Sequence, residues 1–162
     1  GGSINTASGA WSSIGGGFVV RATRDFATVA GGMSNTANSM GAVVAGGRQN
    51  TAGGDGSSND AAVLGGFQNT ASGSQSVVAG GQANTAAGDY AVVAGGSQNE
   101  ASGDNSAAIS GDSNIVTGQY AVVAGGERNS ATGTHSILAG GSQNRATDQY
   151  AAIGGGRSKA AT

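Results

Sequence analysis

The chain has 162 residues, of which 33 are glycine and none is proline or cysteine, and its seven basic and nine acidic side chains give a net charge of −2. This length fits one domain. The charge provides no basic stripe for nucleic acid or anionic lipid, and the lack of cysteine excludes disulfide bonds. No apolar run approaches the roughly 20 residues of a membrane-spanning helix. Such a glycine content is typical of disordered chains, but here the glycines recur at fixed intervals.

A recurring asparagine defines a fifteen-residue repeat. With this residue as position 0, the repeats are centred on Asn5, Val20, Asn35, Asn50, Asn69, Asn84, Asn99, Asn114, Asn129, Asn144 and Lys159. Consecutive centres lie fifteen positions apart, except that Asn50 and Asn69 lie nineteen apart because of a four-residue insertion within residues 54–60. Units this short cannot bury a face alone, so they must stack. The sequence predicts one all-β solenoid domain over residues 1–162, with about eleven coils, and we expect it to belong to a longer array.

Each repeat is predicted to hold two short strands and two turns. The first strand covers positions −8 to −5, as in residues 91–94, where valine and isoleucine are enriched. A glycine pair follows at positions −4 and −3 and predicts a turn with positive φ or close backbone approach. The second strand covers positions 0 to +2, as in residues 84–86, and a glycine at +4 in seven repeats predicts the second turn.

The asparagine column has two structural interpretations. Stacked coils place equivalent residues about 4.8 Å apart, so each side-chain amide can bond to the amides above and below it. Asparagine also tolerates left-handed backbone, so a role in the turn is the alternative.

Two apolar columns of the first strand point to opposite faces. Position −6, next to small residues at −8 and opposite alanine at +2, is predicted to fill the interior, and it includes Val78, Val93, Val123 and Leu138. Position −7, on the other face, is also apolar and includes Val43, Val77, Val92, Val122 and Ile137. Strands that are apolar on both faces are buried on both faces. A lone solenoid would leave the second column in water, so the sequence predicts a homo-oligomer.

The pattern Ser/Ala-Val-Val-Ala-Gly-Gly-x-x-Asn-x-Ala-x-Gly resembles the head repeats of trimeric autotransporter adhesins, the YadA-like heads, which have the pattern Asn-Ser-Val-Ala-Ile-Gly-x-x-Ala-x-Ala-x-Gly. The closest local match is NSAAISGDSNIVTG, residues 105–118. The resemblance spans all eleven repeats, although the repeats here are one residue longer and carry asparagine in place of the first alanine. It implies a left-handed parallel β-roll, a homotrimer, and display on the bacterial cell surface, anchored in the outer membrane through segments outside this sequence.

The resemblance also implies a role in attachment to host cells or to matrix proteins such as collagen, fibronectin or laminin. Repetition of weak contacts along a rod would strengthen such attachment. Matches to the family repeat that is linked with collagen binding are Asn105, Ser106, Ala107, Ala108 and Ile109, with weaker matches at residues 76–80 and 136–140. The simpler interpretation of these residues is a core strand. Surface candidates are Tyr90, Tyr120 and Tyr150 at position −9, together with Asp55, Asn59 and Asp60 in the insertion. The tyrosines could equally shield the coil edges.

Residues that carry catalytic chemistry are scarce. His135 is the one histidine, and without cysteine no His/Cys metal cluster or Cys/His dyad can form within a chain, so neither enzyme activity nor a cofactor is predicted. Aspartates at +5 (Asp25, Asp55, Asp89 and Asp104) are expected to accept hydrogen bonds from turn amides. The insertion could alternatively hold a cation, although it lacks the repeat of calcium-binding rolls.

Three other functions are compatible with repeat architecture. An ice-binding solenoid would carry a flat Thr-x-Thr array, whereas threonine here recurs singly at +1 and gives way to Glu100, Ile115 and Arg145. A hexapeptide-repeat acyltransferase requires a period of six, which does not divide fifteen. A purely structural spacer, such as a segment of a phage or surface fibre with no ligand of its own, is the main alternative to an adhesin.

Overall fold

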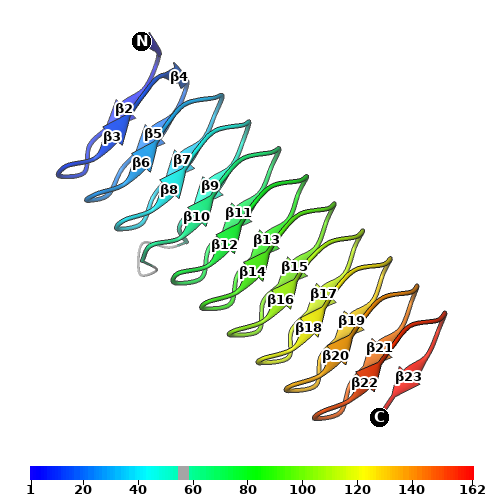
Figure 1. The fold of residues 1–162 in the computed structure, drawn as a ribbon. Helices are drawn as coiled ribbons and strands as arrows, with labels where there is room; N and C mark the ends of the chain where they lie inside the picture. The colour runs from blue at the N-terminus through cyan, green and yellow to red at the C-terminus, as the bar shows by residue number, and fades with distance from the viewer. Residues whose placement is uncertain (55–58) are drawn as a thin grey trace.

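The computed structural model describes residues 1–54 and 59–162, and these residues form a parallel β-solenoid (Figure 1). Successive coils stack in chain order from the N-terminus to the C-terminus, and the described residues contain strands and turns but no helix. Equivalent residues of neighbouring coils pair in register, as Val77 does with Val92, fifteen positions later. This confirms the predicted all-β solenoid with its fifteen-residue coils.

Two long parallel sheets run the length of the rod. The strands at positions −7 and −6 form the ten-stranded sheet, which consists of β3 (Ser13–Ile14), β6 (Thr28–Val29), β8 (Val43–Val44), β10 (Ala62–Val63), β12 (Val77–Val78), β14 (Val92–Val93), β16 (Ala107–Ala108), β18 (Val122–Val123), β20 (Ile137–Leu138) and β22 (Ala152–Ile153). The strands at +1 and +2 form the eleven-stranded sheet, which consists of β2 (Thr6–Ala7), β5 (Arg21–Ala22), β7 (Thr36–Ala37), β9 (Thr51–Ala52), β11 (Thr70–Ala71), β13 (Thr85–Ala86), β15 (Glu100–Ala101), β17 (Ile115–Val116), β19 (Ser130–Ala131), β21 (Arg145–Ala146) and β23 (Ala160–Ala161). A third ladder joins the glycine turns through β1 (Gly2–Ser3), β4 (Gly17–Phe18) and single bridges at position −2.

The strands are two residues long, shorter than the predicted segments of four and three residues. The backbone hydrogen bonds explain the difference at both strands. At position −8, the N–H of Ala91 donates to the carbonyl of Gly88 in its own turn, so this residue belongs to the turn. At position 0, the N–H of Asn99 donates to a side-chain oxygen, Oδ1 of Asn84, instead of a strand carbonyl.

The interior lies between the two long sheets. Valine, leucine or isoleucine at −6 meets alanine at +2, except in one coil, where Ala108 and Val116 exchange these roles. Small residues at −8 together with the asparagines at 0 complete the filling. Val78, Val93, Val123 and Leu138 have no exposed surface, as the pattern of large and small residues predicts. A coil this narrow admits one large side chain per layer, because protein interiors are packed without voids.

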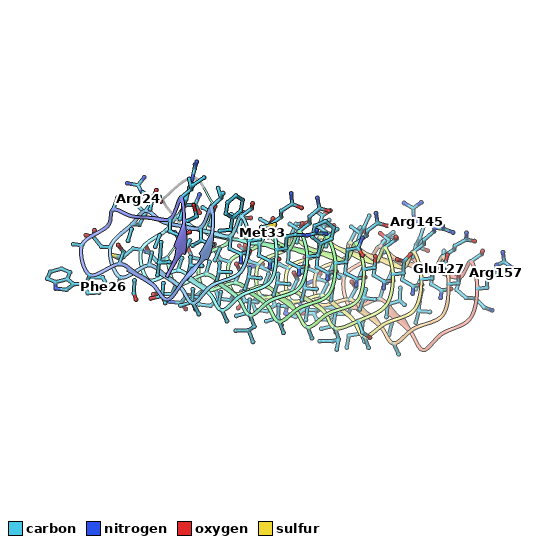
Figure 2. All side chains as sticks on the ribbon, turned by 90° about the horizontal axis from the view of Figure 1, so that it is seen from above. Arg24, Phe26, Met33, Glu127, Arg145 and Arg157 are labelled. Atoms are coloured by element: carbon cyan, nitrogen blue, oxygen red, sulfur yellow. The ribbon has the colours of Figure 1, made fainter. Side chains whose placement is uncertain are left out.

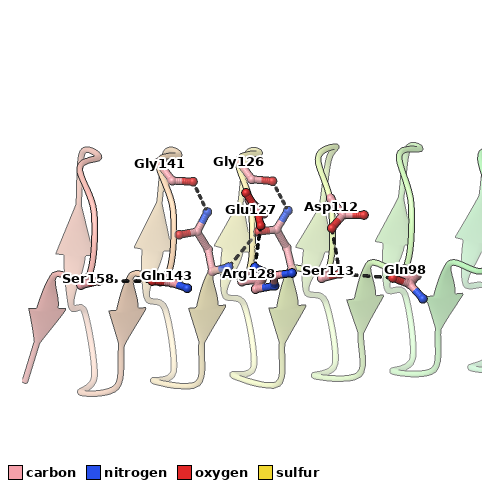
Figure 3. Close-up of polar contacts among 11 residues, drawn as sticks. Gln98, Asp112, Ser113, Gly126, Glu127, Arg128, Gly141, Gln143 and Ser158 are labelled. Carbon is pink, nitrogen blue, oxygen red and sulfur yellow. Dashed lines mark hydrogen bonds and ion pairs between the residues drawn. The ribbon is translucent and has the colours of Figure 1, made fainter.

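The asparagine column forms a ladder in which most hydrogen bonds join a side-chain amide to a backbone group. The N–H of Asn99 donates to Oδ1 of Asn84 at 2.9 Å, and Nδ2 of Asn99 donates to the carbonyls of Gly95 and Gly111, both at 2.9 Å. Figure 3 shows the equivalent bonds to the carbonyls of Gly126 and Gly141. A bond between two side-chain amides, which the first interpretation allowed in every coil, is found from Asn114 Nδ2 to Asn99 Oδ1 at 3.1 Å. Each asparagine thus ties together the glycine turns of two coils.

Three positions per coil, −9, −3 and −1, have left-handed backbone, and the asparagine at 0 does not. The alternative in which asparagine itself occupies the left-handed turn is therefore wrong. Gly96 at −3 has a φ of +89°, and a Cβ there would collide with the carbonyl oxygen of Gly111. Gly95 at −4 has no left-handed φ and no atom within 4 Å of a built Cβ. The predicted turn with positive φ and close backbone approach is thus confirmed at the second glycine of the pair, whereas Gly95 meets neither condition, which agrees with the presence of Ser110 at −4.

The second turn absorbs the insertion without disturbing the stack. Ala62 pairs with Val43, nineteen positions earlier, and Ala62 also pairs in register with Val77 of the next coil. The N–H of Asn69 likewise donates to Oδ1 of Asn50 at 3.0 Å. The four extra residues therefore leave both the strand register and the asparagine ladder intact.

Candidate binding surfaces

The outer face of the ten-stranded sheet is uncharged along the whole rod and apolar from Val43 onward. It is built from positions −7 and −5. Ile137 is 53% exposed and Leu64 is 54% exposed, while Val77 and Val122 are half-buried by their neighbours. The eight strands from β8 to β22, at about 4.8 Å per step, make this apolar strip roughly 35 Å long. A contiguous strip of this length is typical of an interface.

The predicted interface and core residues therefore divide between two environments. Val43, Val77, Val92, Val122 and Ile137 lie on the outer face of the ten-stranded sheet, exposed or half-buried. Their sequence neighbours Val78, Val93, Val123 and Leu138 lie in the interior. Alternation along an extended strand sends adjacent side chains to opposite faces, so one dipeptide supplies both surfaces.

Position −9 forms a second surface, which we call the aromatic edge. It comprises Trp11, Phe26, Gly41, Asp60, Gln75, Tyr90, Asn105, Tyr120, His135 and Tyr150, one residue from each coil, all with left-handed φ. Trp11 stacks on Phe26 with ring centroids 5.0 Å apart. His135 lies between Tyr120 and Tyr150, with centroid distances of 4.9 and 5.1 Å. Left-handed backbone is unfavourable for the tryptophan, phenylalanine and tyrosines of this column, and stacking of planar side chains offsets part of this cost.

The aromatic edge brings together several of the predicted ligand-binding residues. Tyr90, Asn105, Tyr120 and Tyr150 are all exposed on it, and Asp60 occupies the same column near the insertion. Asn59 precedes Asp60 and pairs with Met40 in a parallel bridge. Asp55 lies outside the residues that the structure describes.

The match to the family repeat at residues 105–109 does not form one surface. Ser106 and Ala108 are buried in the interior, whereas Asn105 and Ile109 point outward and Ala107 is half-buried. This alternation is that of an ordinary strand of the stack. A ligand at the surface would meet Asn105 and Ile109 but not Ser106.

The glycine turns form a third surface that the sequence patterns did not identify. Along position −2, Arg48 lies 4.3 Å from the ring centroid of Phe67, and next to this column Arg128 pairs with Glu127 at 2.8 Å. Figure 2 shows Met33, Glu127 and Arg157, all at position −2, following one another along the rod. The fifteen-residue spacing of Phe18, Met33 and Arg48 is the signal that could have revealed this column.

The outer face of the eleven-stranded sheet is polar. Thr36, Thr51, Thr70 and Thr85 pair in register at position +1. Arg21 and Glu100 interrupt this row on either side, and Ile115 follows Glu100. The threonine row is therefore four residues long, which does not make the extended flat array of an ice-binding solenoid.

The aspartates at +5 accept hydrogen bonds from backbone amides of the preceding coil. Oδ1 of Asp25 accepts from the N–H of Ala10 at 2.9 Å, and Oδ1 of Asp89 accepts from the N–H of Ser74 at 2.8 Å. Oδ1 of Asp104 accepts from the N–H of Asp89 itself at 3.1 Å. The predicted amide-accepting role is confirmed for these three residues, and each bond joins two coils. Among the described residues, no group of three or more His, Cys, Asp and Glu side chains is arranged to hold a metal ion.

Comparison with protein-family models gives no match for this chain, and comparison with curated proteins gives none either. Within residues 1–54 and 59–162 there is also no helix long and apolar enough to span a membrane.

Proposed function

We propose that this chain is the head segment of a trimeric surface adhesin. The observation that carries the proposal is the uncharged outer face of the ten-stranded sheet, with its apolar strip. Exposed strips of this kind are covered in most soluble proteins. A second and a third copy of the same chain, each with the same strip, would bury all three strips against one another.

The resemblance to trimeric autotransporter adhesin heads supports three chains and left-handed coils. Three rods packed through one sheet each would leave the polar eleven-stranded sheets facing solvent. In this arrangement the apolar strips meet near a common axis, and residues such as Val92 and Ile137 become buried. Segments outside this sequence would anchor the trimer in the bacterial outer membrane.

Attachment to host matrix proteins or host cells is the function that this arrangement fits. A stiff rod repeats each outward position coil after coil, and three chains multiply the repetition. Contacts that are weak individually then act together through high effective concentration. We propose binding, and not catalysis, as the activity of this segment.

Two measurements test the proposal separately. Light scattering measures whether the chain forms a trimer, and solid-phase assays measure whether the protein binds collagen, fibronectin, laminin or host cells. A trimer that binds at least one of these ligands supports the adhesin. A monomer contradicts the assembly, because the apolar strip would then be exposed to water.

A structural spacer is the second candidate, and the uniformity of the stack favours it. The asparagine ladder continues in register from Asn35 to Asn144, and the insertion does not interrupt it. Such regularity gives length and stiffness without requiring a ligand. A trimer that binds none of the matrix proteins and no host cells would favour the spacer over the adhesin.

A further inference from the structure

The aromatic edge is built by a backbone ladder that fixes the spacing of its side chains. The N–H of Asn105 donates to the carbonyl of Asp89 at 2.8 Å, and the N–H of Tyr120 donates to the carbonyl of Asp104 at 3.0 Å. Tyr90, Asn105 and Tyr120 share nearly the same φ, between 57° and 59°. Their Cα–Cβ bonds therefore leave the rod in the same direction, one coil apart.

One position on this edge shows what fits between two tyrosines. The imidazole of His135 lies between the rings of Tyr120 and Tyr150, tilted by 13° from the first and by 20° from the second. The tyrosines are two coils apart, and the ring of the intervening coil fills the gap between them. The chain thus already places one planar group between two tyrosines that lie two coils apart.

The equivalent gap between Tyr90 and Tyr120 is not filled by a ring. The intervening residue is Asn105, whose side chain is shorter than that of histidine. Two coil steps separate the backbone positions of the two tyrosines by about 9.6 Å. Tyr90 is 55% exposed and Tyr120 is 47% exposed, and the Asn105 amide has no hydrogen-bond partner among the described residues. We call the space beyond the Asn105 amide, between the two exposed tyrosines, the slot.

One carboxylate adjoins this slot. Asp104 precedes Asn105, and its Oδ1 accepts the N–H of Asp89 in the coil of Tyr90, so this carboxylate lies between these two coils. The carboxylate of Asp89 instead accepts the N–H of Ser74 in the preceding coil and lies outside the slot. Oδ2 of Asp104 has no partner within the described part of the chain, so this oxygen is open to a donor from a ligand.

The surrounding charge also favours a cation. Residues 49–127 contain seven acidic side chains and no basic one, so this segment has a charge of −7, while the remaining residues, with seven basic and two acidic side chains, have +5. The sum is the net charge of −2. The slot lies within the acidic segment, which attracts basic groups at low and physiological ionic strength.

We propose that the slot between Tyr90 and Tyr120 binds the guanidinium group of an arginine from a partner protein. A guanidinium is planar, stacks on aromatic faces and carries N–H donors that pair with carboxylates. The tyrosine rings would contact its two faces. Asn105 Oδ1 and the carboxylate of Asp104 would accept its hydrogen bonds. This site stands on the geometry of one chain, so it does not depend on the trimer or on adhesion.

The direct test is an NMR titration of the ¹⁵N-labelled full chain with a capped Gly-Arg-Gly peptide. We expect saturable shifts centred on the amides of Tyr90, Asn105 and Tyr120. Two matched peptides, with lysine and with citrulline in place of arginine, separate charge from planarity. We expect each of them to bind at least about tenfold more weakly, because lysine lacks the planar face and citrulline lacks the charge. Equal shifts with arginine and lysine, or shifts elsewhere on the chain, would overturn the proposal.

The chain supplies its own control for the slot. In Asn105→His the new ring should fill the gap as His135 does two coils later, and the chain already accepts histidine at this φ. We expect this variant to keep its fold and to lose the shifts induced by the arginine peptide. Asp104→Asn keeps the Oδ1 acceptor and should weaken binding about tenfold, because the charge of the carboxylate is lost. Unchanged binding in Asn105→His would show that the peptide does not enter the slot.

Discussion

The two long sheets share one interior, but their outer faces differ in chemistry. From Val43 onward, alanine, valine, leucine, isoleucine and glycine lie outside the ten-stranded sheet without any charge. Threonine, serine, arginine and glutamate lie outside the eleven-stranded sheet, with Ile115 and Ala160 as the apolar exceptions. Both faces are equally regular, because both follow the same fifteen-residue register. The interior residues therefore set the regular stacking of the coils. The outer residues do not take part in this packing, so their chemistry can differ between the two faces.

The largest expected effect comes from placing a charge on the apolar face. Val92→Lys should convert the proposed trimer to monomers, because three unpaired ammonium groups would be buried near the axis, where isolated charges are strongly unfavourable. Sedimentation velocity measures the change. Thr85→Lys, on the outer face of the eleven-stranded sheet, is the matched control and should leave the trimer unchanged.

Removal of one rung of the asparagine ladder should have the next largest effect. Asn84→Ala removes the three hydrogen bonds that the buried side chain makes, to the N–H of Asn99 and to the carbonyls of Gly80 and Gly96. At about 1 kcal/mol each, the free energy of unfolding should fall by roughly 3 kcal/mol. Chemical denaturation measures it, and a loss below about 1 kcal/mol would contradict the ladder as a main source of stability.

Substitutions of two adjacent valines on one strand test which side chain faces the interior and which faces outward. Val93→Ala opens a cavity between the sheets and should lower the free energy of unfolding by about 2 kcal/mol. Val92→Ala, measured in the monomeric background of a charge substitution at Ile137, should cost less than about 1 kcal/mol because this side chain is partly exposed in one chain. Equal losses from the two substitutions, measured by chemical denaturation, would contradict the assignment of the faces.

The smallest effect is expected on the aromatic edge. His135→Ala removes two ring contacts, with Tyr120 and Tyr150, and should lower the free energy of unfolding by about 1 kcal/mol. Gln75→Ala, at the same position in a coil whose side chain there is not a ring, provides the comparison. A loss in His135→Ala no larger than that in Gln75→Ala would show that stacking contributes nothing measurable.

The sequence was sufficient to predict the columns that repeat strictly. Valine at −6 and alanine at +2 fill the interior in most coils, and glycine at −3 allows the left-handed turn. Because these requirements recur every fifteen residues, the period of the sequence shows which residues stack and which face inward. The left-handed backbone at −9 and −1 was not predictable in this way. Tyr90, Gln98 and His135 occupy such positions, although their residue types disfavour that conformation, because the backbone bonds of the stack impose it.

The asparagine column was predictable as a ladder, but its bonding pattern was not. The sequence shows that one amide lies above another, and both amide-to-amide and amide-to-backbone bonds satisfy that spacing. The amide-to-backbone pattern is the one found, because a glycine carbonyl of the same coil and one of the next coil both lie within hydrogen-bond distance of Nδ2. The aromatic edge was similarly predicted as an exposed column, whereas the insertion of His135 between two tyrosines requires the side-chain geometry.

The molar mass in solution tests the central claim, that copies of this chain cover the apolar face, most directly. Light scattering at micromolar concentration should give three times the chain mass of 15.2 kDa for the natural sequence and one chain mass for Val92→Lys. A natural chain that remains at 15.2 kDa, with the outer valines exposed to water, would contradict the account.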